Sequence, residues 1–206
     1  MKVLLGQSKI KSAHISYVPE LLPDELIYSW IGRLISVNAL GCPKDCLEQL
    51  FGNRYVIPSI DLPTLLTDLQ KNLGNNSPFN SAAQLLEAGT LYPYHRPFLT
   101  RERDQSIRKI MFHTDGKGLK MLMGRVANRF GANPPLRFCD ICVKEDTKIF
   151  GTPYWKRHHQ LPGVNCCLKH RIHLEKYISP DLIVDRQHYI LPPYLQSHEK
   201  SANTST

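Results

Sequence analysis

Two short half-sites of metal-binding residues constrain this chain more than any other feature. The stretch "RFCDIC" places two residues between Cys139 and Cys142, and "CCLKHRIH" offers the same spacing between Cys167 and His170. Two intervening residues form a tight turn that brings both side chains of a pair to one ion. Three thiolates and one imidazole in a closed, four-coordinate set favour zinc over magnesium or calcium. The sequence therefore predicts a structural Zn²⁺ site.

The other cysteines and histidines near these half-sites do not keep the spacing. We expect Cys166 to be a small buried hydrophobic residue and His173 to belong to a strand. Cys42 and Cys46 precede or begin an expected helix, and we interpret them as packing residues. A catalytic zinc site normally keeps one position open for water, so a closed set of four protein ligands points to a structural role.

The positive charge of the chain is concentrated in its second half. The net charge is +8, with −1 over residues 1–93 and +9 over residues 94–206. Such asymmetry is typical of a neutral packing region beside a basic region that faces a polyanion. Within the basic half, Trp155 is expected to fill a small core. The predicted nucleic-acid-binding residues are Lys144, Lys148, Lys156, Arg157 and Arg171.

Before residue 131 the apolar residues recur at helical spacing, and short connectors with Gly, Pro or Asn separate the periodic stretches. The expected helices cover 23–41, 43–51, 62–73, 81–89, 101–112 and 118–130. The first two are compatible with a helix-turn-helix. From Leu136 onward helical periodicity is weak. We therefore predict a mainly α fold: an N-terminal arm (1–20), a helical domain (21–130), a zinc-finger segment with short β-hairpins (131–178), then short extended pieces and a disordered tail (179–206).

Several motifs together resemble the TniQ/TnsD family of transposon target-selection proteins. They are "PDELIYSWIGRL" (23–34), "LFGNR" (50–54), "TLYPYHRPF" (90–98) and the zinc stretch from 137 to 170. The resemblance covers roughly residues 20–175. Its zinc ligands fall on the four residues that the spacing selects. Family knuckles often carry glycine where Arg171 stands here, so a positive φ at that turn would strain Arg171 by about 1 kcal/mol.

The resemblance implies a non-enzymatic adaptor. Members bind a fixed attachment site on DNA or dock on an RNA-guided Cascade complex, and they recruit an AAA+ transposition regulator of the TnsC kind. We assign Trp30 and Arg33, in the helical motif, to contacts with a protein partner. The expected setting is the bacterial cytoplasm, associated with DNA and without a membrane contact. Homodimerisation stays open.

Two other functions compete with this one. A zinc-stabilised nuclease of the HNH kind would use the paired histidines of "RHHQLPGVN", but residues 154–170 contain no Asp or Glu to help hold a hydrolytic metal. A purely protein-binding zinc scaffold would leave the basic half merely solvated.

Overall fold

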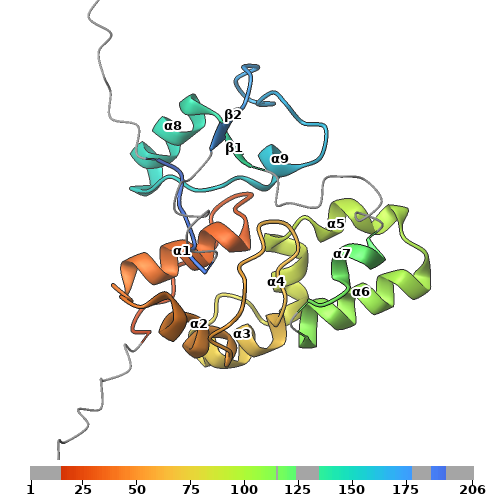
Figure 1. Cartoon of the computed structure of the whole chain (residues 1–206). Coiled ribbons are helices and arrows are strands. Elements are labelled where there is room, and N and C mark those ends of the chain that lie inside the picture. The colour runs from red at the N-terminus through yellow and green to blue at the C-terminus, as the bar shows by residue number, and fades with distance from the viewer. Residues whose placement is uncertain (1–14, 115, 124–134, 178–186, 194–206) are drawn as a thin grey trace, which may run out of the picture.

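The first part of the chain folds into successive helices, most of them joined by short connectors, with a longer one over residues 52–65 between the second and third helices (Figure 1). The computed structural model describes residues 15–114, 116–123, 135–177 and 187–193. We call residues 15–123 the helical region. Its elements are α1 (Ile27–Val37), α2 (Pro43–Phe51), α3 (Leu66–Leu73), η1 (Gly74–Asn76), α4 (Ala82–Gly89), α5 (Tyr92–His95), η2 (Arg96–Phe98), α6 (Arg101–His113) and α7 (Leu119–Leu122).

Local signals set several of these helix ends. Pro43 occupies the first position of α2, and Gly52 ends the helix with φ +67°, as proline and glycine commonly do at these two positions. The side chain of Ser81 accepts a hydrogen bond from the N–H of Gln84 at the start of α4, and Thr100 caps α6 in the same way. The predicted bounds of α2 are confirmed, because the helix runs from Pro43 to Phe51 and ends before Gly52. Most of the expected helix 118–130 lies outside the described residues.

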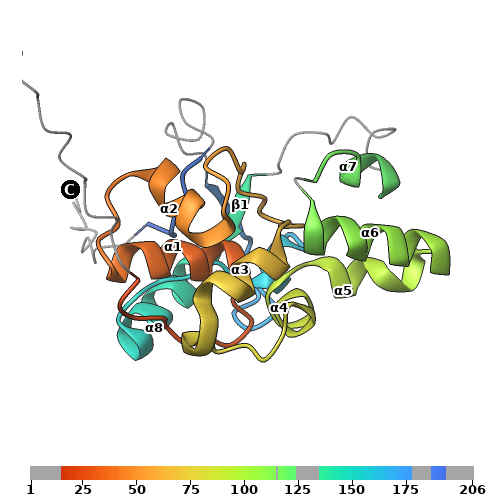
Figure 2. The same ribbon diagram turned by 90° about the horizontal axis from the view of Figure 1, so that it is seen from below.

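The second part comprises residues 135–177, the described residues of the expected zinc-finger segment (131–178), and it keeps that name below. It contains β1 (Leu136–Phe138), α8 (Asp140–Phe150), α9 (Arg157–Gln160) and β2 (Glu175–Tyr177). β1 and β2 pair antiparallel, with Leu136 opposite Tyr177 and Phe138 opposite Glu175. Figure 1 shows these elements gathered on one side of the molecule, next to α1, while Figure 2 shows α6 and α7 at the far end of the helical region.

Three expectations about helices were wrong, and the smallest error is α3, which begins at Leu66 and not at residue 62. The first helix begins at Ile27 rather than at Pro23, because residues 24–26 pair with the zinc-finger segment instead of entering the helix. The N–H of Leu26 donates to Trp155 O at 2.9 Å, and the N–H of Arg157 donates to Asp24 O at 2.8 Å. The third error is α8, which we did not expect. Its buried residues include Cys142 and Asp146, so its inner face lacks an apolar stripe.

The helical region and the zinc-finger segment share one apolar cluster. Leu26 and Tyr28 of the helical region pack with Phe138, Val143 and Trp155 of the zinc-finger segment. Trp155 has no exposed surface, which confirms its expected place in a core. The two regions are therefore joined by buried side chains and not only by a linker.

Residues 187–193, which we call the C-terminal strap, cross this junction between α1 and α8 (Figure 1). The N–H of Ile190 donates to the Tyr28 hydroxyl at 3.1 Å, and the Trp155 indole N–H donates to Ile190 O at 2.6 Å. The strap contains no strand; the other predicted extended pieces and the tail lie outside the described residues. Over the parts of the chain that the structure describes, no helix has the length and apolar character needed to cross a membrane.

Candidate metal centre and its surroundings

The four predicted ligands come from two turns that the fold brings together. Cys139 is the residue that precedes α8, and Cys142 lies in the first turn of that helix. Cys167 and His170 lie in the turn between Cys166 and His173, which face each other in an isolated antiparallel bridge. Within that turn the N–H of Arg171 donates to Cys167 O at 2.8 Å.

The ligand atoms have the separations of a tetrahedral site. The His170 Nδ1 atom lies 3.3 Å from the Sγ atoms of Cys139 and Cys142 and 3.6 Å from Cys167 Sγ. The Sγ atoms of Cys142 and Cys167 are 3.6 Å apart. Zinc bond lengths in a tetrahedron give about 3.8 Å between two sulfurs and about 3.5 Å between sulfur and nitrogen. The four atoms, all within 4.8 Å of one another, therefore fit one Zn²⁺ ion.

The surroundings of the four side chains also suit a metal. The three cysteines are buried, and their side chains form a cluster of their own against Leu174. Burial raises the pKa values of the Cys139 and Cys142 thiols. For Cys167 burial acts in the same direction, but hydrogen bonds from the backbone N–H groups of His170 and Lys169 outweigh it and lower the pKa to about 7. Such backbone donors stabilise a thiolate ligand.

The imidazole of His170 has an outer partner on the side away from the sulfurs. Its Nε2 atom lies 3.2 Å from Glu145 Oε2 on α8, and Lys169 Nζ lies 2.5 Å from the same oxygen. Metal-bound histidines commonly direct their second ring nitrogen to a carboxylate, which fixes the orientation of the ring. We did not expect Glu145, although its position three residues after Cys142 on a helix would have suggested it.

The cysteines and the histidine outside the ligand set have mixed outcomes. Cys166 is exposed, so its predicted burial was wrong; its Sγ atom lies 3.8 Å from Nδ1 of His173. His173 pairs with Cys166 in the bridge, as a strand-like residue would. Cys46 packs in the helical core as expected, but Cys42 is exposed.

The predicted nucleic-acid-binding residues divide into two groups. Lys144, Lys148 and Arg171 are exposed. Arg171 has φ +56°, the positive value that the turn was expected to need.

Lys156 and Arg157 instead make contacts inside the protein. Lys156 Nζ lies 2.9 Å from the buried Asp146 carboxylate and 2.7 Å from the Tyr154 hydroxyl, and only 13% of its side chain is exposed. The Arg157 guanidinium donates to Ala88 O in the helical region. The expectation that these two cations face a polyanion does not fit these contacts, because reaching a phosphate would break them.

The two predicted partner-binding residues differ in their surroundings. Trp30 has no exposed surface, and its indole N–H donates to Pro19 O at 2.8 Å, so it cannot contact a partner directly. Arg33 pairs with the buried Glu25 carboxylate at 2.6 Å. Burial raises the Glu25 pKa to about 7, against the opposing effect of Arg33.

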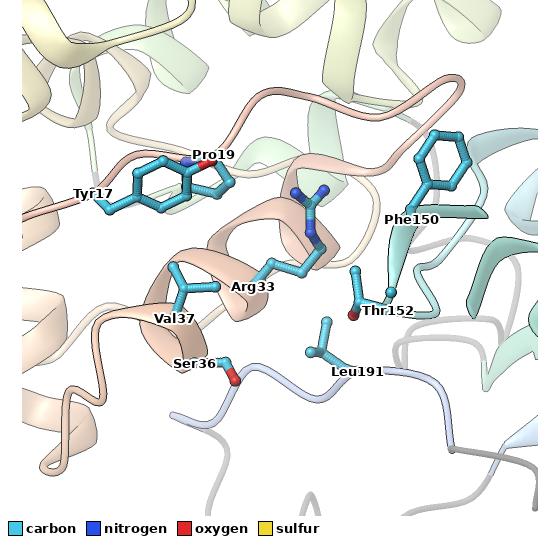
Figure 3. Close-up of a pocket in the computed structure, with 9 residues that line it drawn as sticks. Tyr17, Pro19, Arg33, Ser36, Val37, Phe150, Thr152 and Leu191 are labelled. Carbon is cyan, nitrogen blue, oxygen red and sulfur yellow. The ribbon is translucent and has the colours of Figure 1, made fainter. Parts of the chain in front are cut away.

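Arg33 nevertheless lines a pocket of about 340 Å³ at the end of α1 (Figure 3). Figure 3 shows its side chain between Tyr17 and Pro19 on one side and Phe150, at the end of α8, on the other. The remaining lining residues are Ser36, Val37, Gly151, Thr152 and Leu191. Several of them are exposed and apolar or aromatic, including Tyr17, Val37 and Phe150.

Known proteins resemble this chain in sequence. Residues 16–174 match the sequence model of the TniQ family. The chain is also 31% identical over 148 residues to the Transposon Tn7 transposition protein TnsD of Escherichia coli, an alignment that covers 71% of this chain and 29% of that relative. The chain thus spans less than a third of the length of the relative. All four candidate metal ligands lie within the range that the family model matches, and the chain belongs to the TniQ/TnsD family.

Proposed function

We propose that this chain is a target-selection adaptor of a heteromeric transposon. In this role it binds target DNA or an RNA-guided Cascade complex and recruits an AAA+ ATPase regulator of the TnsC kind. Family membership over residues 16–174 is the observation that carries the proposal. The relative that it resembles is named as a transposition protein.

The metal in this proposal is Zn²⁺ with a structural role. Cys139, Cys142, Cys167 and His170 would hold it, and their closed arrangement leaves no ligand position for a reacting water. When bound, the ion supplies folding free energy to a segment that has few apolar residues of its own. The adaptor is accordingly proposed to have no enzymatic activity.

The nucleic-acid contact is proposed on the exposed face of α8 and on the neighbouring turn. Lys144 and Lys148 are four residues apart on one helix, so their side chains lie on the same face. Both are exposed, as is Arg171 in the turn that carries Cys167 and His170. A helix bearing regularly spaced cations suits successive phosphates of a nucleic acid.

A charge-reversal experiment tests this face. Lys144→Glu with Lys148→Glu should weaken DNA binding, measured by fluorescence anisotropy, and lower the slope of log affinity against log salt by about 2. The matched control reverses two exposed lysines of the helical region, Lys44→Glu with Lys71→Glu, and so makes the same change in net charge. Equal weakening by both pairs would indicate only a general charge effect. No DNA binding by the unaltered chain at low salt would favour docking on a Cascade complex or the protein-binding scaffold.

The protein partner is proposed to contact the pocket lined by Arg33. Its exposed apolar side chains come from three separate parts of the chain, so the pocket exists only when the two regions are assembled. Val37→Asp should abolish a pull-down with the ATPase regulator, because it places a charge in an apolar contact. Ile57→Asp, at an exposed apolar position outside the pocket, is the control. If Val37→Asp still binds the regulator, the partner contacts a different surface.

A further inference from the structure

A second cluster of metal-ligand side chains lies directly beside the first. One ring nitrogen of His158, one ring nitrogen of His159 and the Sγ atom of Cys167 all lie within 4.8 Å of one another. The histidines belong to α9, whereas Cys167 also belongs to the first set. A tetrahedral ion would hold such atoms about 3.5 Å apart, so the side chains need to close by at most about 1 Å around it.

His159 supplies an independent sign that a ligand is missing here. The residue is only 2% exposed, and its Nε2 atom is buried with no hydrogen-bond partner among the described residues. Buried polar atoms nearly always have a partner, and one that lacks it calls for an explanation. One ring nitrogen of His159 lies within 4.8 Å of Cys167 Sγ, and a buried, unpartnered imidazole beside a thiol is suited to a metal ion.

His158 is already oriented as a metal ligand would be. Its backbone N–H donates to the Asp24 carboxylate at 3.1 Å, and its ring Nδ1 contacts the same oxygen. This contact leaves Nε2 as the nitrogen available to an ion. A carboxylate on the second ring nitrogen is the usual outer partner of a metal-bound histidine.

We propose that His158, His159 and Cys167 bind a second transition-metal ion, which shares the Cys167 thiolate with the structural zinc. Two imidazoles and one thiolate suit Zn²⁺ or Co²⁺ and not Mg²⁺ or Ca²⁺. The fourth position is left to water or to a donor from a partner. The inference goes beyond the adaptor function, which needs only the first ion. The second set offers three protein ligands, whereas the first offers four, so the second ion is the weaker one and leaves first on chelation.

Counting the ions tests the proposal directly. The full chain is titrated with Zn²⁺ alone and examined by native mass spectrometry. The unaltered chain should bind two ions, and His158→Gln or His159→Gln should bind one. Asp24→Asn should keep both but bind the second about 10–100-fold more weakly. His113→Gln, an exposed histidine on α6, is the control and should bind two.

Three results would overturn the second site. One is a single ion in the unaltered chain at saturating zinc. Another is two ions in both histidine variants, which would put the extra ion elsewhere. The third is a count of zero ions, which would also remove the first site. The count therefore distinguishes failure of the second site alone from failure of both sites. If His159→Gln fails to fold, the ion counts of His158→Gln and Asp24→Asn test the second site, because both positions are more exposed than His159. With Co²⁺, the second equivalent should change the thiolate charge-transfer band in the unaltered chain and not in His158→Gln.

Discussion

The helical region and the zinc-finger segment are stabilised by different means. The helical region has a large apolar cluster around Trp30, Leu34 and Leu47, to which several helices contribute. The zinc-finger segment has one buried cluster that it does not share. This cluster consists of three cysteines, and Leu174 packs against it. Most of its other buried apolar residues, including Phe138, Val143 and Trp155, belong to the cluster shared with the helical region. A segment with so little apolar surface of its own depends on a bound ion and on its neighbour.

The junction between the regions contains polar as well as apolar contacts. Lys156 bonds to Asp146 and Tyr154 within the zinc-finger segment, while the Tyr154 hydroxyl donates to Pro23 O at 3.0 Å in the helical region. We therefore expect a change at the junction to destabilise both regions. A change in the helical core alone should destabilise the helical region and leave the zinc-finger segment intact.

Loss of the metal should have the largest effect. Cys139→Ser removes one of the four candidate ligands, so the zinc-finger segment should lose its ion together with most of about 10–16 kcal/mol of apparent binding free energy. We expect no bound zinc by elemental analysis and an unfolded segment by NMR. The helical region should melt at a lower temperature because the shared cluster opens. A metal-free Cys139→Ser protein with an unchanged Tm would contradict the dependence on metal.

Breaking the buried ion pair between Lys156 and Asp146 within the zinc-finger segment should come next. Lys156→Met leaves the Asp146 carboxylate, whose side chain is 8% exposed, without its cation. Leaving a buried charge unpaired costs about 3–5 kcal/mol. We expect Lys156→Met to lower the free energy of unfolding, measured with urea, by this amount. The double variant Lys156→Met with Asp146→Leu should recover most of that loss. A cost below about 1 kcal/mol would mean that the pair behaves as an exposed one.

A cavity in the helical core should destabilise the protein without touching the metal. Leu47 has no exposed surface, and Leu47→Ala should lower the free energy of unfolding by about 2–5 kcal/mol. The zinc content should stay the same as in the unaltered chain. Loss of zinc together with loss of stability would show that the regions are more tightly coupled than their separate clusters suggest.

Relieving backbone strain at the metal-binding turn should have the smallest effect. Arg171 has φ +56°, so Arg171→Gly should stabilise the protein by less than about 1 kcal/mol, since glycine removes the strain but adds entropy to the unfolded chain. Arg171→Ala keeps the strain and removes the same charge. The difference in Tm between the two variants isolates the backbone contribution, and equal Tm values would mean that the turn is unstrained.

Some features could be predicted because their signals are local. The bounds of α2 follow from Pro43 and Gly52, which act within a residue or two of the helix ends. The two metal half-sites could be selected because each pair spans only four residues, and the structure brings all four side chains together. The mainly helical class follows from the periodicity of the first 130 residues.

Other features were beyond the sequence because distant residues decide them. The start of α1 depends on hydrogen bonds between residues 24–26 and residues 155–157, more than a hundred positions later. Lys156 looks like a surface cation in the sequence. Its partners Asp146 and Tyr154 are near it in the sequence, but only the packing of the segment buries the three together.

The sequence by itself thus determined the fold class, the family and the four side chains that can share an ion, since each rests on local spacing or on a pattern along the chain. The tertiary structure alone decided which cations remain exposed, that Trp30 is a core residue, and that His158 and His159 lie next to Cys167. The physical reason is that burial and pairing depend on what packs against a residue, and in this protein the packing partners are often more than a hundred residues away.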